Sequence, residues 1–326
     1  MGFIFQKVLS KVTEKPEDLD GLDTLLIAAM NTTFYFAVTS CKLSNWKEVM
    51  EGWVRHVEKE WSRFRTGNEL GRLNQLKVGR TITLSPPFID IIQRAEEYRR
   101  KTNGLFSPYL LPQMQFHGYE NSFPFDTSRL VDSEMPPVYE NEISPFQFSP
   151  NTNSVTRITD GLVDLGGIGK GYTVQAAAQW LRHVGEASAG MVDGGGDISV
   201  WSDGSKEWTI GVSHPYHQET EIAQLRLKNG GIATSNVVYR SWSQGDEKKH
   251  HIIDGRTGLP ADNHYIQATV IAENCLDAEV GAKLCLIEND SDIKHQLRNL
   301  DTAYSFLLVN NQGKLFAFEM EEPTHE

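Results

Sequence analysis

The glycine-rich segment 163–172, which reads VDLGGIGKGY, constrains the fold of this chain more than any other part of the sequence. Its four glycines lie just before a segment of helical composition, so the backbone can approach a ligand closely and direct unpaired N–H groups toward it. The helix dipole adds positive potential there, and Lys170 adds a full charge in the first turn. The segment therefore predicts a loop and a helix N-terminus that cradle a pyrophosphate.

Two common phosphate-binding motifs do not describe this segment. Gly171 follows the lysine where a Walker A loop has Ser or Thr, and Tyr172 stands where GxGxxG has its last glycine. A glycine-rich turn that lets a helix pack closely on a strand has the same composition. The segment by itself leaves both interpretations open.

Two further segments carry acidic and imidazole side chains. Residues 193–198, DGGGDI, place two acids around a glycine cluster, where they either bind a ribose or adenine or satisfy the amides of a turn. Residues 250–260, HHIIDGRTGLP, place His251 three residues before Asp254, as in a general base with its orienting carboxylate or in a surface loop. No HxxxH or HExxH pattern occurs, which argues against a zinc site.

Charge and hydropathy exclude several classes of partner. The formal net charge of −12 argues against broad binding to nucleic acids or anionic membranes, which requires clustered Lys and Arg. No window approaches the roughly 18 apolar residues of a membrane span. The N-terminal residues lack a long apolar core and a small-residue cleavage site, so we expect a cytoplasmic protein with no membrane insertion. The three cysteines are irregularly spaced and form no disulfide framework.

Hydrophobic periodicity predicts an α+β fold in which mixed or antiparallel sheets are flanked by helices. β-branched and aromatic residues predict a strand or hairpin at 24–40, and apolar residues at helical spacing predict helices at 46–64 and 88–102. A helix is expected after the glycine-rich segment. The remaining expected elements are strands at 188–201, 207–213, 221–227 and 265–272, a helix near 276–287 and a closing hairpin.

The length of 326 residues suits one large domain. We expect an N-terminal extension over 1–23 and a single domain over 24–326, within which two intimate lobes are possible.

Seven collinear groups of residues resemble motifs of the ApbE family of FAD:protein FMN transferases, from about residue 25 to residue 290. Any one of them is modest support, and their common order makes the set specific. They are 28–32 (AAMNT), 62–64 (SRF) with 68–74 (NELGRLN), 104–108 (GLFSP) with 117–119 (HGY), 164–172 (DLGGIGKGY), 194–198 (GGGDI), 233–235 (ATS) and 251–260 (HIIDGRTGLP). The resemblance implies an ApbE-like, T-fold-related architecture for the domain.

The resemblance also implies which residues bind FAD. Met30 and Phe64 would border the isoalloxazine, and Gly118 and Tyr119 would line the flavin pocket. The remaining FAD-binding residues implied by the motifs are Asp164 and Lys170 on the pyrophosphate and adenosine side, Asp197, Ser235 and the backbone near Ile253. His251 would act as the general base near the acceptor hydroxyl, with Lys170 as the second catalytic residue.

In such enzymes a Mg²⁺ sits between a backbone carbonyl of the glycine loop, here Gly167, and an Asp and a Thr one helical turn apart. The best-matching positions in this chain are Glu279 and Lys283. Glu keeps an oxygen ligand, whereas the Lys283 ammonium could pair with Glu279 and compete with the magnesium site. In a shifted register Asp277 would be the ligand instead. Smaller departures include Asn31 where the family motif has Gly.

The expected activity is therefore the transfer of FMN from FAD to a Ser or Thr hydroxyl of an acceptor protein, with release of AMP and with Mg²⁺ or Lys283 neutralising charge. The altered metal positions motivate a second possibility, a non-catalytic FAD carrier or sensor. Hydrolysis of the FAD pyrophosphate to FMN and AMP is the third.

Overall fold

The computed structural model describes residues 4–11, 21–140, 142–217, 219–300 and 305–319. The chain divides into two compact units whose segments alternate along the sequence. The first unit contains 1–55, 170–239 and 263–326, and the second contains 56–169 and 240–262. Strands and helices occur in both, and nearly all strand pairs are antiparallel, which confirms the predicted α+β class. No helix in the described ranges combines the length and apolar composition of a membrane span.

An antiparallel eight-stranded sheet forms the centre of the first unit, in the order β17-β16-β15-β12-β9-β8-β3-β2. Strand β15 is buried along its whole length, in keeping with its β-branched composition. The strands are β2 (Asp23–Ala29), β3 (Thr32–Thr39), β8 (Ala189–Asp193), β9 (Asp197–Ser202), β12 (Gly230–Asn236), β15 (Tyr265–Ala272), β16 (Ser305–Asn310) and β17 (Leu315–Glu319).

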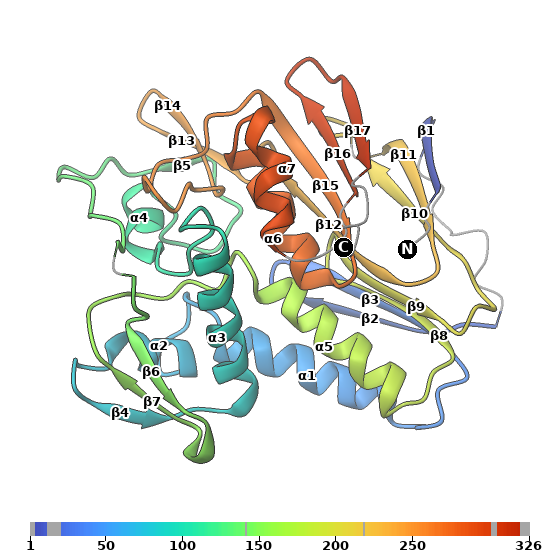
Figure 1. The fold of residues 1–326 in the computed structure, drawn as a ribbon, viewed down its shortest axis with the longest axis horizontal. Helices are drawn as coiled ribbons and strands as arrows, with labels where there is room; N and C mark the ends of the chain where they lie inside the picture. Colours follow the sequence, from blue (N-terminus) through green and yellow to red (C-terminus); the bar gives the residue numbers. More distant parts are fainter. Residues whose placement is uncertain (1–3, 12–20, 141, 218, 301–304, 320–326) are drawn as a thin grey trace, which may run out of the picture. The chain divides into compact units, whose positions relative to one another are not determined.

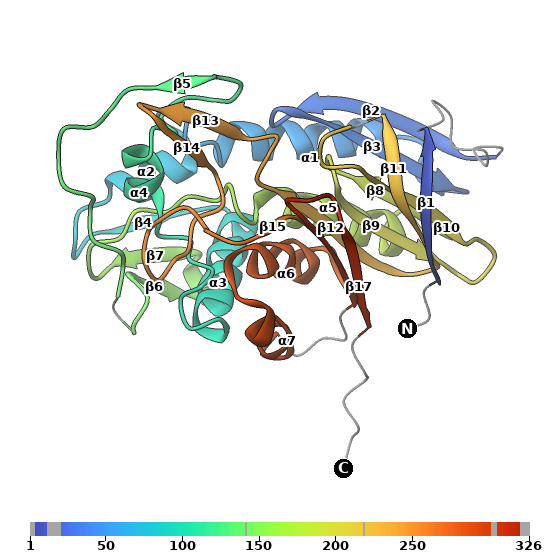
Figure 2. The ribbon, with the colours of Figure 1, turned by 90° about the horizontal axis from the view of Figure 1, so that it is seen from above.

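Helices cover one face of this sheet. Helix α1 (Trp46–Glu60), which belongs to the first unit as far as Arg55, runs beside α5 (Gly169–His183), as Figures 1 and 2 show. The indole Nε1 of Trp53 joins the two helices by donating to the Thr173 carbonyl at 3.0 Å. Their apolar sides pack on β3 in a buried cluster that includes Phe34, Phe36, Met50, Val54, Val174 and Leu181. Two more helices complete this unit, α6 (Cys275–Ile287) and α7 (Asp290–Arg298).

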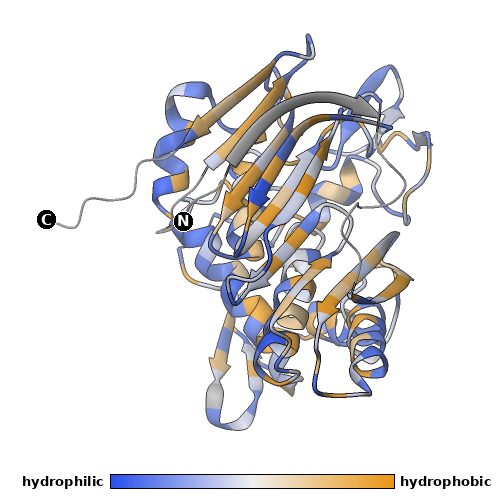
Figure 3. Cartoon of the chain, turned by 90° about the vertical axis from the view of Figure 1, so that its right-hand side faces the viewer, coloured by the Kyte–Doolittle hydropathy of each residue, from blue (hydrophilic) through white to orange (hydrophobic). Residues whose placement is uncertain are grey.

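A three-stranded antiparallel sheet has the order β1-β11-β10, and the apolar side chains of β10 and β11 pack against the large sheet. Strand β10 (Trp208–Ser213) alternates strictly between buried and exposed residues, the pattern of a strand with one face on a core. In Figure 3 orange residues alternate with white and blue ones along strands of the molecule, as expected for strands with one apolar face. Strand β11 (Thr220–Leu227) is central and pairs with β1 (Ile4–Lys11), which falls within the predicted N-terminal extension. The predicted boundary at residue 24 stays a prediction.

The second unit is built from helices and short strands, and the strands form two small sheets, β4-β7-β6 and β14-β13-β5. Only the β13–β5 pair is parallel among the strand pairs of the described residues. Its strands are β4 (Thr81–Thr83), β5 (Thr127–Ser128), β6 (Phe146–Ser149), β7 (Ser154–Arg157), β13 (Ser241–Gln244) and β14 (Glu247–His250). Its helices are α2 (Glu69–Gln75), α3 (Pro86–Lys101), α4 (Leu111–Phe116) and the 3₁₀ turn η1 (Pro150–Thr152).

Local sequence signals located several elements correctly. The hairpin predicted at 24–40 is β2 and β3, joined at Met30 and Asn31, whose φ angles are 50° and 59°. The helix predicted at 88–102 is α3, which begins with two prolines in its first turn and is followed by Gly104 at φ 84°.

Two boundaries differ from the prediction. Helix α1 ends at Glu60 rather than at Phe64. There the Asn68 side-chain amide donates to the Lys59 carbonyl (2.9 Å), an acceptor left at the helix end, and to the Ser62 carbonyl (2.7 Å) of the following loop. The strand predicted at 188–201 is two strands, β8 and β9, because the glycines at 194–196 form a turn with positive φ at two positions.

Candidate active site

Lys170 and Asp197 form an ion pair at the N-terminus of α5 in the first unit. Lys170 lies in the first turn of α5, and Asp197 is the first residue of β9 and is 2% exposed. The ammonium donates a short hydrogen bond to the Asp197 carboxylate. Two residues that the sequence assigned to the nucleotide are therefore in contact, and the charge of Asp197 holds the Lys170 ammonium at the positive end of a helix.

Asp193, the other acid of the glycine cluster, stabilises the turn between β8 and β9. Its Oδ1 accepts hydrogen bonds from the backbone N–H groups of Gly195 and Gly196, both at 2.8 Å. Burial raises the pKa of Asp193, although these N–H groups oppose the rise. Of the two roles left open for the acids of this segment, Asp193 takes the structural one.

Glu279 connects α6 to the N-terminus of α5. It is 1% exposed, and its Oε2 accepts a hydrogen bond of 2.9 Å from the Gly171 N–H. Its Oε1 lies 3.3 Å from the Lys283 Nζ, which also donates to the Glu279 carbonyl at 3.2 Å. Burial raises the pKa of the Glu279 carboxyl, and the Lys283 ammonium opposes this rise. A Cβ at position 171 would lie 2.5 Å from Oε2, so only glycine permits this contact.

The predicted metal ligands do not form a donor set that fits Mg²⁺. Magnesium takes oxygen ligands in octahedral geometry, whereas the Lys283 ammonium is a donor with no lone pair. Both carboxylate oxygens of Glu279 already have partners in Gly171 and Lys283. Asp277 accepts a bond of 2.5 Å from the Asn274 side chain, which in turn caps α6. The described residues contain no group of three or more His, Cys, Asp or Glu side chains arranged as a metal site.

Met30 and Ser235 also lie in the first unit. Met30 is half-buried at the tip of the β2–β3 hairpin and packs against the cluster beneath α1 and α5. Asn31 tolerates its left-handed backbone far better than most residues, which explains why it can replace the glycine of the family motif. Ser235 is buried within β12. The structure does not test their contact with FAD, which stays a prediction.

In the second unit an arginine joins two aromatic rings to an acid. The Arg63 guanidinium lies 4.7 Å from the Phe64 ring centre and 4.3 Å from the Tyr119 ring centre. It forms an ion pair with Asp164, whose Oδ1 accepts from the Gly166 N–H at 2.8 Å. We call Arg63, Phe64, Tyr119 and Asp164 the aromatic clamp. Three of its members were predicted from sequence, and the structure brings them together.

Arg63, the fourth member, was missed as a site residue, although it stands in the quoted SRF motif. Its side chain is 7% exposed, so the attraction to both rings acts in a shielded environment. Its Nη2 also donates to the Tyr119 carbonyl at 3.3 Å. The only signal in the sequence was a charged residue between Ser62 and an aromatic residue, which is typical of many loops.

Asn74 was also missed and holds the backbone ahead of Asp164. Its Nδ2 donates to the Val163 carbonyl at 2.9 Å, and its Oδ1 accepts from the Val163 N–H at 2.8 Å. The Asp164 N–H then donates to the Pro108 carbonyl at 2.8 Å. An amide side chain is required here because it offers a donor and an acceptor together. Its place at the end of the NELGRLN motif was the available signal.

The environment of Gly118 and Ile253 is tightly packed. Gly118 has φ 91°, and a Cβ there would lie 2.0 Å from the Ser128 Oγ. Ile253 is 6% exposed, packs with Tyr119 and Trp242, and forms an isolated backbone bridge to Pro260. Gly167 is half-buried, in the turn that precedes α5.

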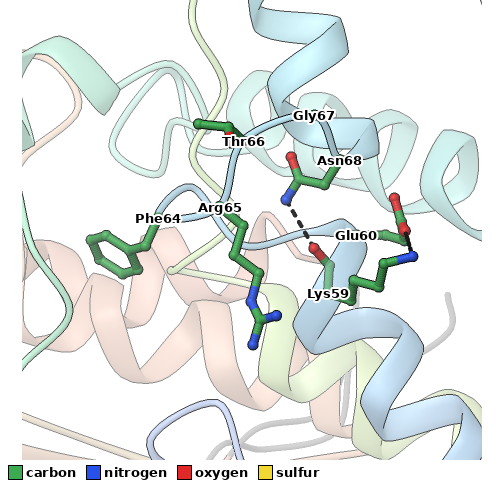
Figure 4. Close-up of a pocket in the computed structure, with 7 residues that line it drawn as sticks. All are labelled: Lys59, Glu60, Phe64, Arg65, Thr66, Gly67 and Asn68. Atoms are coloured by element: carbon green, nitrogen blue, oxygen red, sulfur yellow. Dashed lines mark hydrogen bonds and ion pairs between the residues drawn. The ribbon is translucent and has the colours of Figure 1, made fainter.

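A pocket of about 460 Å³ is lined by the end of α1 and the loop that follows it. Phe64, which is 42% exposed, borders it. In Figure 4 the Phe64 ring points away from Asn68 and from the ion pair of Lys59 with Glu60. The other residues that line the pocket are Arg65, Thr66 and Gly67.

The adjacent histidines His250 and His251 have different hydrogen-bond partners. His250 donates from Nε2 to the Ala261 carbonyl at 3.0 Å and accepts at Nδ1 from the Ile252 N–H at 3.3 Å, which fixes a neutral ring. His251 is half-buried, with Nδ1 3.3 Å from the Arg240 carbonyl. A carbonyl only accepts, so this contact places the proton on Nδ1 and leaves Nε2 as the basic nitrogen.

Acid is expected to destabilise the second unit through His117 and His250. Burial lowers the pKa of both, and His117 donates from Nε2 to the Gly258 carbonyl at 2.8 Å. Between the lowered pKa and the unfolded value of about 6.5, only the unfolded chain binds the proton, so the free energy of unfolding falls as pH falls. The slope is at most about 1.4 kcal/mol per pH unit for each histidine. Urea unfolding at a series of pH values measures it, and H117Q should show a shallower slope; an equal slope would contradict the assignment.

Sequence comparisons relate the chain to one protein family. A sequence model of the ApbE family matches residues 30–307. A protein named FAD:protein FMN transferase from Klebsiella pneumoniae (strain 342) is 28% identical over 211 residues, which cover 62% of this chain and 63% of that relative. The chain thus matches just under two thirds of that relative's length. A protein of the same name from Haemophilus influenzae is 23% identical over 279 residues, covering 81% of this chain and 79% of the relative.

Solved structures show the same fold at low identity. The ApbE protein from Thermotoga maritima has a TM-score of 0.75 and 22% identity, covering 92% of this chain and 100% of its own. The flavin transferase ApbE from Vibrio cholerae has a TM-score of 0.71 and 21% identity, covering 91% of this chain and 96% of its own. The family match spans most of the chain and includes every motif that the sequence suggested except the beginning of the first. The chain belongs to the ApbE family.

Proposed function

We propose that the chain transfers FMN from FAD to a Ser or Thr hydroxyl of an acceptor protein and releases AMP. The observation that carries this proposal is the glycine loop leading into α5 with Lys170 in the first turn, in a chain of the ApbE family. A helix N-terminus with an adjacent ammonium is the arrangement that stabilises a pyrophosphate. The name FAD:protein FMN transferase, which the related proteins bear, supports the same reaction.

The proposed step is an in-line displacement at phosphorus. The acceptor hydroxyl oxygen attacks the phosphorus of the FMN half, and the bond from that phosphorus to the bridging oxygen breaks. AMP leaves with the bridging oxygen, while the hydroxyl proton passes to the Nε2 of His251. Lys170 stabilises the negative charge that develops on the leaving phosphate.

The remaining roles follow the geometry of each unit. Phe64 and Tyr119 offer aromatic faces to the isoalloxazine, and Arg63 fixes both rings through its contacts in the aromatic clamp. Met30, Gly118 and the Ile253 backbone are proposed as further flavin contacts. The residues proposed to contact the adenosine and the pyrophosphate are Asp164, Lys170, Asp197 and Ser235.

No proposed step uses a magnesium ion at Glu279 and Lys283, because the donors there do not fit one. The location is proposed to be cytoplasmic, and the acceptor is accordingly a cytosolic protein or one with a hydroxyl exposed to the cytosol. Subcellular fractionation tests this part separately.

The transfer reaction is tested by incubating the purified chain with FAD and a cytosolic extract. We expect flavin fluorescence on an acceptor band after denaturing electrophoresis, a Ser or Thr peptide that carries FMN by mass spectrometry, and AMP in equal amount. Boiled enzyme is the control. Absence of both AMP and flavinylated peptide contradicts the proposal.

The same assay without the extract separates the two alternatives from the transferase. A hydrolase would release FMN and AMP although no acceptor is present. The FAD carrier is favoured by one observation, the altered pair of Glu279 and Lys283, and it would return intact FAD after prolonged incubation.

A further inference from the structure

The carboxylate of Glu279 is deeply buried and yet has two positive partners within the first unit. One is the N-terminus of α5, through the Gly171 N–H at 2.9 Å. The other is the Lys283 ammonium at 3.3 Å. Since Glu279 is 1% exposed, water contributes almost nothing to its solvation. The protein itself therefore supplies the positive charge that a buried carboxylate requires.

Lys283 is held in place by the helix that carries it. Its Nζ contacts both the side chain and the backbone carbonyl of Glu279, one helical turn earlier on α6. The Lys283 side chain is 13% exposed, so its aliphatic part is also enclosed. An ammonium with two oxygen partners and little exposure is a fixed cation rather than a mobile surface charge.

The length of Glu279 matters to this arrangement. A glutamate reaches one methylene further than an aspartate, and here its Oε2 reaches the backbone of α5 so closely that a Cβ on Gly171 would lie 2.5 Å away. The N-terminus of α5 thus stabilises Oε2 of Glu279, and the Lys283 ammonium stabilises Oε1. The two departures from the family pattern, Glu for Asp and Lys for Thr, therefore depend on each other.

A second ion pair lies beside the first. Lys170 is paired with Asp197, and both of these charges act on the Glu279 carboxyl. The two ammonium groups balance the two carboxylates of Glu279 and Asp197. A third acid, Asp193, acts on the same ion pair and has its own donors in the Gly195 and Gly196 N–H groups. The positive partners of all three acids thus come from the protein itself.

We propose that the Lys283 ammonium is an internal cation that takes the place of a divalent metal ion at this face of α6, so that the first unit folds and stays folded without Mg²⁺. A metal ion that bound the Oε1 of Glu279 would have to displace the Lys283 ammonium from it. The inference concerns charge and stability, and it holds whether or not the chain transfers FMN.

The test measures metal binding and thermal stability without FAD or acceptor, so its failure is distinct from failure of the proposed function. Mn²⁺, which has octahedral oxygen chemistry like that of Mg²⁺, is titrated into the wild type and followed by electron paramagnetic resonance. We expect no stoichiometric binding to the wild type. We also expect the same melting temperature in Mg²⁺ and in EDTA.

The variant K283M removes the charge and keeps the side-chain length. In EDTA its Tm should fall by roughly 5 to 10 °C, because one partner of a buried ion pair is lost. The double variant E279Q/K283M removes both charges and should recover at least half of that fall. The matched control is K228M, since Lys228 is exposed and its Nζ lies 3.5 Å from a single carbonyl; its Tm should not change.

Two results overturn the proposal. One is a single Mn²⁺ site in the wild type that disappears in E279Q. The other is a K283M variant that melts like the wild type in EDTA. Should K283M fail to fold, the Mn²⁺ titration and the EDTA melt of the wild type still decide the question.

Discussion

The variant H251N is expected to transfer FMN about 100 to 10,000 times more slowly than the wild type, the usual contribution of a general base. Asparagine can keep the donor that faces the Arg240 carbonyl, because its Nδ2 lies near the position of the histidine Nδ1. It has no basic nitrogen at the position of Nε2. The loss should therefore appear in kcat, while the dissociation constant for FAD, measured by flavin fluorescence, stays close to the wild-type value.

The neighbouring histidine provides the control for that experiment. The variant H250Q keeps a donor toward the Ala261 carbonyl, and His250 has no role in the proposed reaction. Its kcat should match the wild type. If H250Q loses as much activity as H251N, the general base has been assigned to the wrong histidine. If neither variant loses activity, no imidazole of this pair accepts the proton.

The variant K170M is expected to lower the rate of FMN transfer by a factor of about 100 to 1000, the range found when one charge-stabilising donor is removed. FAD binding should weaken too, because the ammonium acts on the pyrophosphate before the reaction as well as during it. Steady-state kinetics then show a lower kcat and a higher KM, in contrast to the pure kcat effect of H251N.

K170M is also expected to destabilise the fold, because the Asp197 carboxylate, which is 2% exposed, loses its ion-pair partner. The double variant K170M/D197N removes both charges. It should regain thermal stability relative to K170M but no activity. If activity returns together with stability, Lys170 serves the fold alone and the proposed role in catalysis is wrong.

The elements that the sequence predicted well depend on local chemistry. The α5 helix follows its glycines, α3 follows its two prolines, and the β2–β3 hairpin turns at Met30 and Asn31. In each case a few adjacent residues restrict φ or provide a cap, so the signal is contained in a short window. The contact of Lys283 with Glu279 was predicted for the same reason, because residues four apart share a helix face.

The contacts that the sequence did not predict join residues far apart in the chain. Arg63 and Asp164 are 101 positions apart, and Glu279 and the Gly171 N–H are 108 apart. The motifs identified Asp164 and Glu279 as site residues but carried no information about their partners. Arg63 and Asn74 were missed because their importance comes from the tertiary contacts that bury them. FAD contacts of the individual site residues remain predictions.

The alternation of the two units along the chain has a consequence for synthesis on the ribosome. The chain passes from one unit to the other after Arg55, Gly169, Tyr239 and Asp262. The β2–β3 hairpin emerges early, but β8, the strand that pairs with β3, follows only after residues 56–169 have been made. At about 5 to 20 residues per second, the nascent hairpin waits about 8 to 30 seconds with an unpaired edge. The second unit likewise cannot complete its β14-β13-β5 sheet until β12 of the first unit has been translated. Each unit thus depends on a segment that is made after a segment of the other, so neither can be complete until late in translation.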